Sequence, residues 1–335
     1  MKKFQKYIIL FLTVVLIISL AGCQSRKRPK EPENQQAQKE AEKTKEAPKI
    51  PKAINQGEGQ EPKLVVYIAD EKTNKEMAFE EYLQGVVAGE MKKDWPIEAL
   101  KAQTILARSF VMEFVDSKGS SKYEGAHIST DIEEAQAWNA SEINENIVNA
   151  VNSTRGQVLV HDNKYIKAWF HAHAGGRTAN AVEGLGYDEG NPPYIESVES
   201  PDSKEAPEDD VNWSATFTKG EIIEAVRASG QEAGDFDKIE ITEKGPSGRA
   251  YKLQIGKANV LAPAFRVALD STKMKSTQIK DITVSEGKVT ITGTGYGHGV
   301  GMSQWGAYQM AKEGKSAEDI INHYFKDVDI VQLWK

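Results

Sequence analysis

Glu90 is the residue with the most direct potential for chemistry, because it places a carboxylate on an otherwise apolar helix face. The segment leading to it carries its large apolar side chains at the i, i+3, i+4 spacing of an amphipathic helix: Phe79, Tyr82, Leu83, Val86 and Val87. Glu90 is the next position on that stripe. Burial raises the pKa of a carboxyl group, as a general acid near neutral pH requires. The alternative is a structural role, in which Glu90 caps a helix or forms a salt bridge.

A second candidate region is a glycine-rich stretch near the C-terminus. Glycines alternate along it, which lets the backbone approach a partner closely and adopt positive φ: Gly293, Gly295, Gly297, Gly299 and Gly301. It lacks the Gly-Lys-Ser/Thr sequence of a P-loop and the GxGxxG spacing of a dinucleotide-binding loop. Ser303 is placed to cap a helix over Gln304–Lys312. Because His298, Gln304 and Trp305 accompany the glycines, we interpret the stretch as a binding loop; a plain tight turn is the alternative.

Two histidines, His171 and His173, stand at i and i+2 and would project to one face of a strand. Zinc sites usually add cysteine, histidine or carboxylate ligands at compact spacing, and no such cluster is evident in the sequence. We therefore expect no metal and no cofactor, with these histidines lining a polar cleft. Arg108 has apolar helical neighbours, so its guanidinium is expected to be buried against a carboxylate or carbonyl; substrate contact is the alternative.

The elements that would position these groups give an α+β fold. Strands are expected over Leu64–Ile68, in a hairpin over 157–160 and 164–170, and over Ile239–Thr242, Tyr251–Ile255 and Lys288–Thr292. Helices are expected over Phe79–Met91, from Asp94 (N-cap) and Pro96 to about Val115, and over Glu142–Asn152 and Lys219–Ala228. The rest of 200–235 is expected to be a polar loop. We expect one large domain over 61–335, in which two lobes could enclose a cleft.

Composition and the N-terminus limit partners and location. The net charge is −7, and no basic cluster occurs in the later part of the chain, which argues against a nucleic-acid partner. Residues 1–22 have the basic start and short apolar run of a signal peptide. They lead into Leu20-Ala-Gly-Cys23, which resembles the lipobox of bacterial lipoproteins. That resemblance implies lipid on Cys23 and an anchor at the outer face of the cytoplasmic membrane; an uncleaved signal anchor is the alternative. Residues 23–60 are predicted to be a disordered tether.

Five stretches together resemble the SpoIID/LytB domain family, that of sporulation stage II protein D. They are Glu81-Tyr-Leu-x-Gly-Val-Val-Ala-x-Glu-Met91, Ala107-Arg-Ser109, Gln136-Ala-Trp138, Phe170-His-x-x-x-Gly-Gly-x-Thr178 and Gly295-Tyr-Gly-His-Gly-Val-Gly-Met-Ser-Gln-Trp-Gly-Ala307. The resemblance implies a peptidoglycan lytic transglycosylase that cleaves glycan strands already stripped of peptides by a partner amidase. It also implies a role in septal wall thinning and engulfment during sporulation. The family's catalytic glutamate falls on Glu90. Some relatives bind zinc near the position of His127, where this chain has no cysteine.

Glycoside cleavage requires a proton on the leaving oxygen. A lytic transglycosylase uses the sugar's own C6 hydroxyl as nucleophile, so Glu90 alone can act as acid and then as base. Asp94 or Asp131 could still approach through folding and supply the second carboxylate of a hydrolase. Candidates for stacking on sugars or hydrogen-bonding their substituents are Arg108, Gln136, Trp138, Trp169, His171, Arg177, Tyr296, His298, Ser303, Gln304 and Trp305. The alternative function is a non-catalytic wall-binding module that stimulates an N-acetylmuramoyl-L-alanine amidase.

Overall fold

A computed structural model describes residues 47–335 of the chain. The predicted signal peptide (1–22), the lipidation site at Cys23 and most of the predicted tether lie outside the described residues. Within 47–335, no helix is both long enough and apolar enough to cross a membrane.

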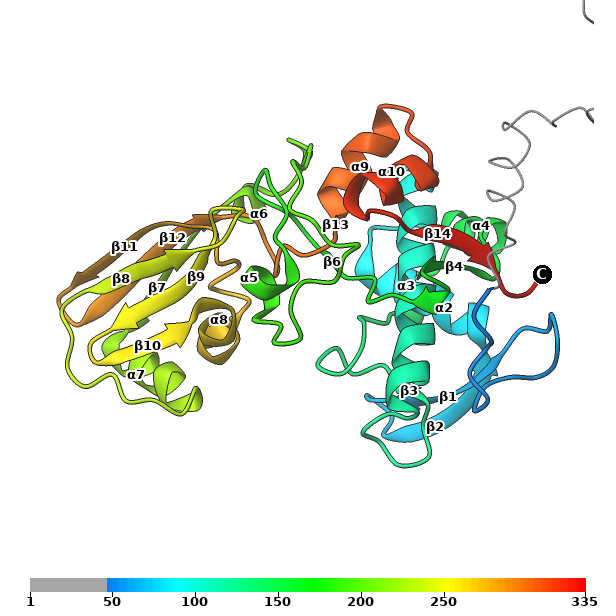
Figure 1. Cartoon of the computed structure of the whole chain (residues 1–335), viewed down its shortest axis with the longest axis horizontal. Helices are drawn as coiled ribbons and strands as arrows, with labels where there is room; N and C mark the ends of the chain where they lie inside the picture. The colour runs from blue at the N-terminus through cyan, green and yellow to red at the C-terminus, as the bar shows by residue number, and fades with distance from the viewer. Residues whose placement is uncertain (1–46) are drawn as a thin grey trace, which may run out of the picture. The chain divides into compact units, whose positions relative to one another are not determined.

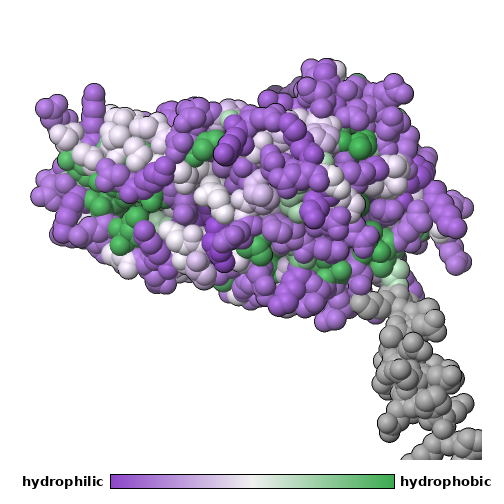
Figure 2. All heavy atoms as spheres, turned by 90° about the horizontal axis from the view of Figure 1, so that it is seen from above, coloured by the Kyte–Doolittle hydropathy of each residue, from purple (hydrophilic) through white to green (hydrophobic). Residues whose placement is uncertain are grey.

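Two separate hydrophobic cores divide the described residues into two lobes. The first lobe comprises residues 47–211 and 295–335. The second lobe, residues 212–294, is inserted into the chain of the first (Figure 1). Each lobe contains helices and strands, which confirms the predicted α+β class. On the face shown in Figure 2 hydrophilic side chains predominate, and apolar ones form small patches.

The first lobe is built around one long helix, α3 (Ile97–Lys118), which is buried on most of its sides. Four helices pack against it: α2 (Phe79–Glu90), α4 (Glu145–Ser153), α9 (Gln304–Lys312) and α10 (Ala317–Tyr324). A helix that is buried on most sides lies at the centre of a lobe, as α3 does. A helix with a single apolar stripe packs that stripe against the central helix and exposes its other face.

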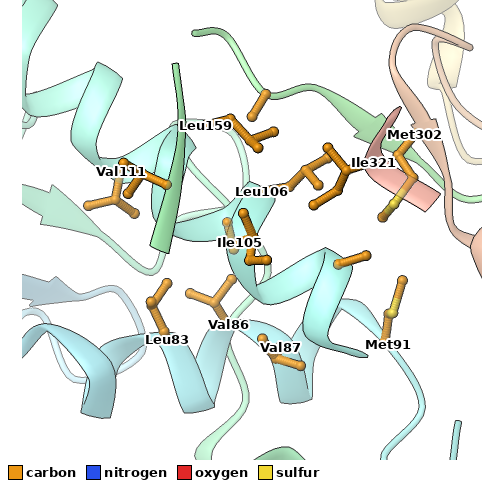
Figure 3. Close-up of a cluster of buried hydrophobic side chains, with 14 of the residues drawn as sticks. Leu83, Val86, Val87, Met91, Ile105, Leu106, Val111, Leu159, Met302 and Ile321 are labelled. Carbon is orange, nitrogen blue, oxygen red and sulfur yellow. The ribbon is translucent and has the colours of Figure 1, made fainter. Parts of the chain in front are cut away.

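The contact between α2 and α3 places the predicted apolar stripe inside the first core. Figure 3 shows Leu83, Val86 and Val87 of α2 next to Ile105 of α3. All five stripe residues of α2 are fully buried. The predicted helix over Phe79–Met91 is therefore confirmed, and Glu90 is its last residue.

The start of α2 is held by a buried ion pair. Glu80 accepts hydrogen bonds from Arg108 Nη2 (2.6 Å) and Nε (3.2 Å). The same carboxylate accepts from the Gly156 amide and from Trp334 Nε1, both at 3.0 Å. A charge pair removed from water is tolerated when further hydrogen bonds satisfy its remaining atoms, and Glu80 meets that condition.

Small sheets complete the first lobe. Their orders are β2-β1-β3, β14-β4-β5 and β13-β6, with β1–β3 and β6–β13 parallel. The strands are β1 (Lys63–Ile68), β2 (Thr73–Ala78), β3 (Ile128–Ser129), β4 (Gln157–His161), β5 (Lys164–Tyr165), β6 (Phe170–His171), β13 (Met302–Ser303) and β14 (Asp329–Gln332). The predicted hairpin forms, but its second strand ends at Tyr165. Residues 170–171 pair instead with 302–303, which brings the glycine-rich stretch beside the His171 segment.

The second lobe consists of two three-stranded antiparallel sheets and two helices. The sheet orders are β11-β12-β7 and β10-β9-β8. Its elements are β7 (Asn212–Thr218), α7 (Lys219–Ala228), β8 (Ile239–Lys244), β9 (Ala250–Ile255), β10 (Ala258–Leu261), α8 (Ala262–Asp270), β11 (Ile279–Ser285) and β12 (Lys288–Thr294). The prediction of a polar loop before α7 was wrong. Trp213, Ala215 and Phe217 alternate with polar residues there, so β7 buries one face against the second core.

Short helical turns fill the connections. They are η1 (Ala140–Glu142), α5 (Ala181–Leu185) and α6 (Glu208–Val211). The helix predicted to begin at Glu142 begins three residues later, because the Asn144 side chain caps it by accepting from the Ile147 amide at 3.0 Å. The predicted N-cap Asp94 was also wrong: Pro96 occupies that position, since α3 begins at Ile97.

The folded chain begins before the predicted boundary at residue 61. Ile54 is fully buried in the first core. Its carbonyl accepts a hydrogen bond from the Lys63 amide at 3.3 Å, and the Lys49 carbonyl accepts one from the Tyr165 hydroxyl at 3.2 Å. The prediction that the tether extends to residue 60 is therefore corrected for 47–60, where isolated isoleucines anchor an otherwise polar segment.

Candidate active site

Glu90 lies at the C-terminal end of α2 and is partly buried. The helix end carries carbonyl groups and the negative pole of the helix dipole, and α2 has no basic residue in its last turn. The surroundings therefore disfavour the ionised carboxylate.

Two segments distant in the sequence hold the Glu90 side chain. The Ala137 amide donates to Oε1 at 2.7 Å. Gln304 Nε2 lies 3.4 Å from Oε2 and 3.2 Å from the Glu90 backbone oxygen. The predicted site residues Glu90 and Gln304 are thus brought together, with the 136–138 segment beside them.

Two glycines of α2 let the 136–138 segment come this close. A Cβ on Gly89 would lie 2.7 Å from the Ala137 carbonyl carbon, and one on Gly85 would lie 2.1 Å from Trp138 Nε1. The Gly85 carbonyl also accepts from the Asn139 amide at 2.9 Å. Because Gly85 and Gly89 are one helical turn apart, they form a smooth face against which the segment lies.

Gln304 is positioned by the turn from β13 into α9. Ser303 caps α9, as predicted, by accepting from the Gly306 amide at 3.2 Å. Gln304 Nε2 also lies 3.5 Å from Oε1 of Gln103, a fully buried residue of α3. Gln103 was not predicted from the sequence, because it stands in a mixed stretch beside Lys101 and Thr104, where a polar residue gives no special signal.

The pKa of Glu90 is raised to about 7. Burial is the main cause, because it penalises the charged form. The hydrogen bonds from Ala137 and Gln304 stabilise the carboxylate and oppose that effect. A group with this pKa can both donate and accept a proton near neutral pH.

A cavity of about 560 Å³ opens beside Glu90. It is lined by residues 88–94 with Glu142 and Asn144, so it belongs to the first lobe and does not lie between the lobes. Asp94 and Glu142 are the other carboxylates in its lining. Asp131 lies elsewhere: it pairs with Lys122 at 2.7 Å and Tyr123 at 2.8 Å, and these bonds lower its pKa to about 2.

Gln136, Trp138 and Trp305 lie around the Glu90 site. Both polar atoms of the buried Gln136 amide, and Nε1 of Trp138, lack hydrogen-bond partners within the described residues. Trp305 packs against Trp95, with ring centroids 4.6 Å apart, and Tyr308 contacts both rings. These unpartnered atoms are buried, so the Gln136 amide and the Trp138 indole nitrogen are not exposed to a ligand, and Trp305 is likewise mostly enclosed.

Arg108 and Ser303 have structural roles. Arg108 is fully buried, paired with Glu80 and bound to the Gln157 carbonyl at 2.9 Å, so its predicted contact with substrate was wrong. Ser303 is also fully buried; besides capping α9 it donates to Asp202 at 2.6 Å. Neither side chain is free to meet a ligand.

The histidines and Arg177 form a separate group around the glycine-rich stretch. His171 Nδ1 lies 3.1 Å from the Val300 carbonyl, and His298 Nδ1 accepts from the Val300 amide at 3.0 Å. Burial lowers the pKa of His298 to about 3, so it is neutral. Arg177 is exposed and bonds to Ser197. None of these side chains hydrogen-bonds to Glu90 in the part of the chain that the structure describes.

The remaining aromatic candidates lie in the same part of the first lobe. Tyr296 has the Lys275 ammonium 5.0 Å from its ring centre, and Trp169 meets Tyr187 edge-on at 5.4 Å. Four of the five glycines have positive φ, and a Cβ at Gly301 would lie 2.0 Å from the Trp169 carbonyl oxygen. The glycines therefore serve close backbone packing.

Within residues 47–335 no group of three or more His, Cys, Asp or Glu side chains is arranged to hold a metal. His127 Nδ1 accepts from the Val65 amide at 2.9 Å.

The fold and site define an α+β protein that presents one partly buried carboxyl group, able to exchange a proton, to an open cavity. Residues 68–161 match the family model described as stage II sporulation protein, and residues 195–301 match a domain of unknown function. The chain is 32% identical to stage II sporulation protein D of Bacillus amyloliquefaciens, covering 83% of each chain. It is 30% identical to that of Bacillus subtilis, covering 80% of this chain and 78% of the relative. The chain belongs to the stage II sporulation protein D family.

A further relative is the amidase enhancer of Bacillus subtilis, which is 26% identical over 72% of this chain and 39% of that protein.

Proposed function

We propose that this protein is a peptidoglycan lytic transglycosylase that cleaves peptide-stripped glycan strands and leaves 1,6-anhydro-muramic acid ends. The proposal rests on one observation above all: Glu90, with a pKa raised to about 7, faces an open cavity. Membership of a family named for sporulation supports wall remodelling at the septum and during engulfment as the setting.

In the proposed reaction Glu90 acts first as an acid. Its protonated carboxyl donates to the glycosidic oxygen as the bond from that oxygen to C1 of muramic acid breaks. The resulting carboxylate then takes the proton of the C6 hydroxyl as O6 bonds to C1. Glu90 is thereby returned to its protonated form, and no water is consumed.

The hydrogen bonds to Glu90 suit both steps. Ala137 and Gln304 donate to the carboxylate and so stabilise it after proton transfer, while burial favours the protonated form before transfer. The residues that line the cavity beside Glu90 are the proposed contacts for the sugars. Digestion of peptide-stripped strands, with the products identified by mass, tests the reaction.

A second function is a non-catalytic module that binds wall glycan and stimulates an amidase. The likeness to the amidase enhancer favours it. This function predicts that amidase stimulation survives Glu90→Gln, whereas the enzymatic proposal predicts that strand cleavage does not.

We further propose that lipid on Cys23 holds the protein at the outer face of the cytoplasmic membrane, where it works beside an amidase. Labelling with a fatty acid tests this. Label is expected on the wild-type protein and absent from Cys23→Ala; label that persists in the variant would contradict the proposal.

A further inference from the structure

The cavity beside Glu90 contains two lysines whose surroundings differ. Lys93 Nζ lies 2.7 Å from Glu142 Oε2, so its charge already has a partner. Lys92 is exposed and forms no ion pair with any of residues 47–335. Its ammonium lies over the Trp305 ring, 5.5 Å from the centre. An aromatic face attracts a cation without neutralising it, so Lys92 keeps its charge available.

Trp305 links Lys92 to Glu90. The ring is only 6% exposed, because it packs against Trp95 and Tyr308. Its chain neighbour Gln304 donates one of the hydrogen bonds to Glu90; the Ala137 amide donates the other. Trp305, which lies under the Lys92 ammonium, and Gln304, which hydrogen-bonds to the Glu90 carboxyl, are therefore consecutive residues. Lys92 and Glu90 both line one cavity.

We propose that Lys92 binds the free lactyl carboxylate of a muramic acid residue and so selects strands from which peptides have been removed. This inference rests on the proposed function. In a peptide-bearing strand the lactyl carbonyl is part of an amide and carries no charge. Hydrolysis of that amide leaves one carboxylate on each muramic acid, which an unpaired ammonium recognises. The reaction that supplies the substrate is accordingly an amide hydrolysis at the lactyl group.

The other charged residues of the cavity affect how strongly a carboxylate is expected to bind there. Glu142 is neutralised by Lys93, and Glu90 is protonated in the form that acts as an acid. Asp94 lines the cavity, is exposed and makes no ion pair within the described residues, so it repels an incoming carboxylate. Removing the Asp94 charge should therefore strengthen binding of stripped strands, whereas removing the Lys92 charge should weaken it.

Binding is measured in the Glu90→Gln background, so that cleavage does not intervene. Three ligands are compared: stripped strands, stripped strands whose lactyl carboxyls have been converted to methylamides, and peptide-bearing strands. Lys92→Gln should weaken binding of stripped strands by about two- to fivefold, the range of an exposed ion pair, and less at high salt. It should leave binding of the methylamide strands unchanged. Asp94→Asn should act in the opposite direction.

The double variant Lys93→Gln, Glu142→Gln is the matched control, since it removes a neighbouring lysine of the same cavity together with the carboxylate that it pairs with and so leaves the net charge of the cavity unchanged. Its effect on stripped strands should be clearly smaller than that of Lys92→Gln. Equal effects of the two variants, equal weakening on charged and methylamide strands, or an effect confined to peptide-bearing strands would each overturn the inference. If binding depends on the Lys92 charge but the wild-type protein cleaves no strands, the proposed lytic transglycosylase function is refuted and the role of Lys92 in binding stands.

Discussion

Gln304 and Glu90 stand 214 residues apart, yet the Gln304 amide hydrogen-bonds to both the backbone oxygen and the carboxyl of Glu90. The second lobe is inserted between them in the chain, and the parallel pairing of β6 with β13 returns the chain to α2. The C-terminal part of the protein therefore helps to set the protonation of a group on α2.

Replacing Gln304 by Met should move the pH profile of cleavage. The Gln304 bond stabilises the ionised form of Glu90, so its loss should raise the Glu90 pKa by about 0.5–1 unit, the value of one hydrogen bond. Because cleavage needs the protonated acid, the alkaline limb of the pH profile should move to higher pH. Gln309→Met on the same helix is the control, since the Gln309 side chain hydrogen-bonds to Glu313 at 2.8 Å and to no group of the Glu90 site. An unshifted limb in Gln304→Met would contradict this role.

Glu90 should make the protein less stable as the pH rises. Its pKa is about 7 in the folded state, above the ordinary value of 4.5, so the folded state binds more protons between these pH values. The stability that protonated Glu90 contributes is fully present below about pH 4.5 and is lost as the pH rises to about 7. The free energy of unfolding should fall by about 1–3 kcal/mol over this range. Glu90→Gln should therefore be more stable than wild type at pH 8 and similar at pH 4.5. Denaturant unfolding at both pH values measures the difference, and a constant difference would show that the Glu90 pKa is not raised.

Gly89→Ala should cost activity although alanine favours helices. The new Cβ would meet the Ala137 backbone at 2.7 Å and push the donor of the Glu90 hydrogen bond away from α2. Gly220→Ala in α7 is the matched control, because its nearest neighbour would be 3.7 Å away. That change should stabilise the protein or leave it unchanged, within about 1 kcal/mol. If Gly89→Ala and Gly220→Ala have similar melting temperatures and activities, Gly89 is not needed for the close approach of residues 136–138 to α2.

Arg108→Met should lower stability without altering substrate binding. The change leaves the Glu80 carboxylate buried without its cation, which typically costs about 3–5 kcal/mol. Thermal unfolding measures that loss. Binding of stripped strands is then compared below the melting temperature; an Arg108→Met protein that is fully folded but binds severalfold more weakly would restore Arg108 as a substrate contact.

The sequence predicted those parts of the site that depend on local pattern. The period of Phe79, Tyr82 and Leu83 identified α2 and placed Glu90 on its buried side. Ser303 and the helix after it followed from capping chemistry. Such signals arise within one or two helical turns, where spacing alone fixes which side chains share a face.

Other parts of the site depend on contacts that no local pattern contains. The Ala137 amide is a backbone group, so its residue type gives no sign that it donates to Glu90. The role of Gly89 becomes visible only when the 136–138 segment lies on α2. Gln103 reaches the site through a contact 201 residues away in sequence.

The fold was predicted least well where few apolar residues define an element. Strand β7 carries one large aromatic residue at each end of its buried face, and sparse apolar content made it resemble a loop. The same reason placed the domain boundary too late, since Pro51 and Ile54 are the two buried residues within 47–60. Conversely, Arg108 was expected to need a carboxylate, and Glu80 supplies it.

The most direct test of the central claim is the chemistry of the cut end. Peptide-stripped strands are digested by wild-type protein and by Glu90→Gln in water labelled with heavy oxygen, and the muramic acid ends are analysed by mass spectrometry. Wild type should give 1,6-anhydro ends, lighter by one water than reducing ends and free of label, because the C6 hydroxyl is the nucleophile. Glu90→Gln should reduce cleavage by orders of magnitude. Reducing ends that carry heavy oxygen, or undiminished cleavage by Glu90→Gln, would contradict the account.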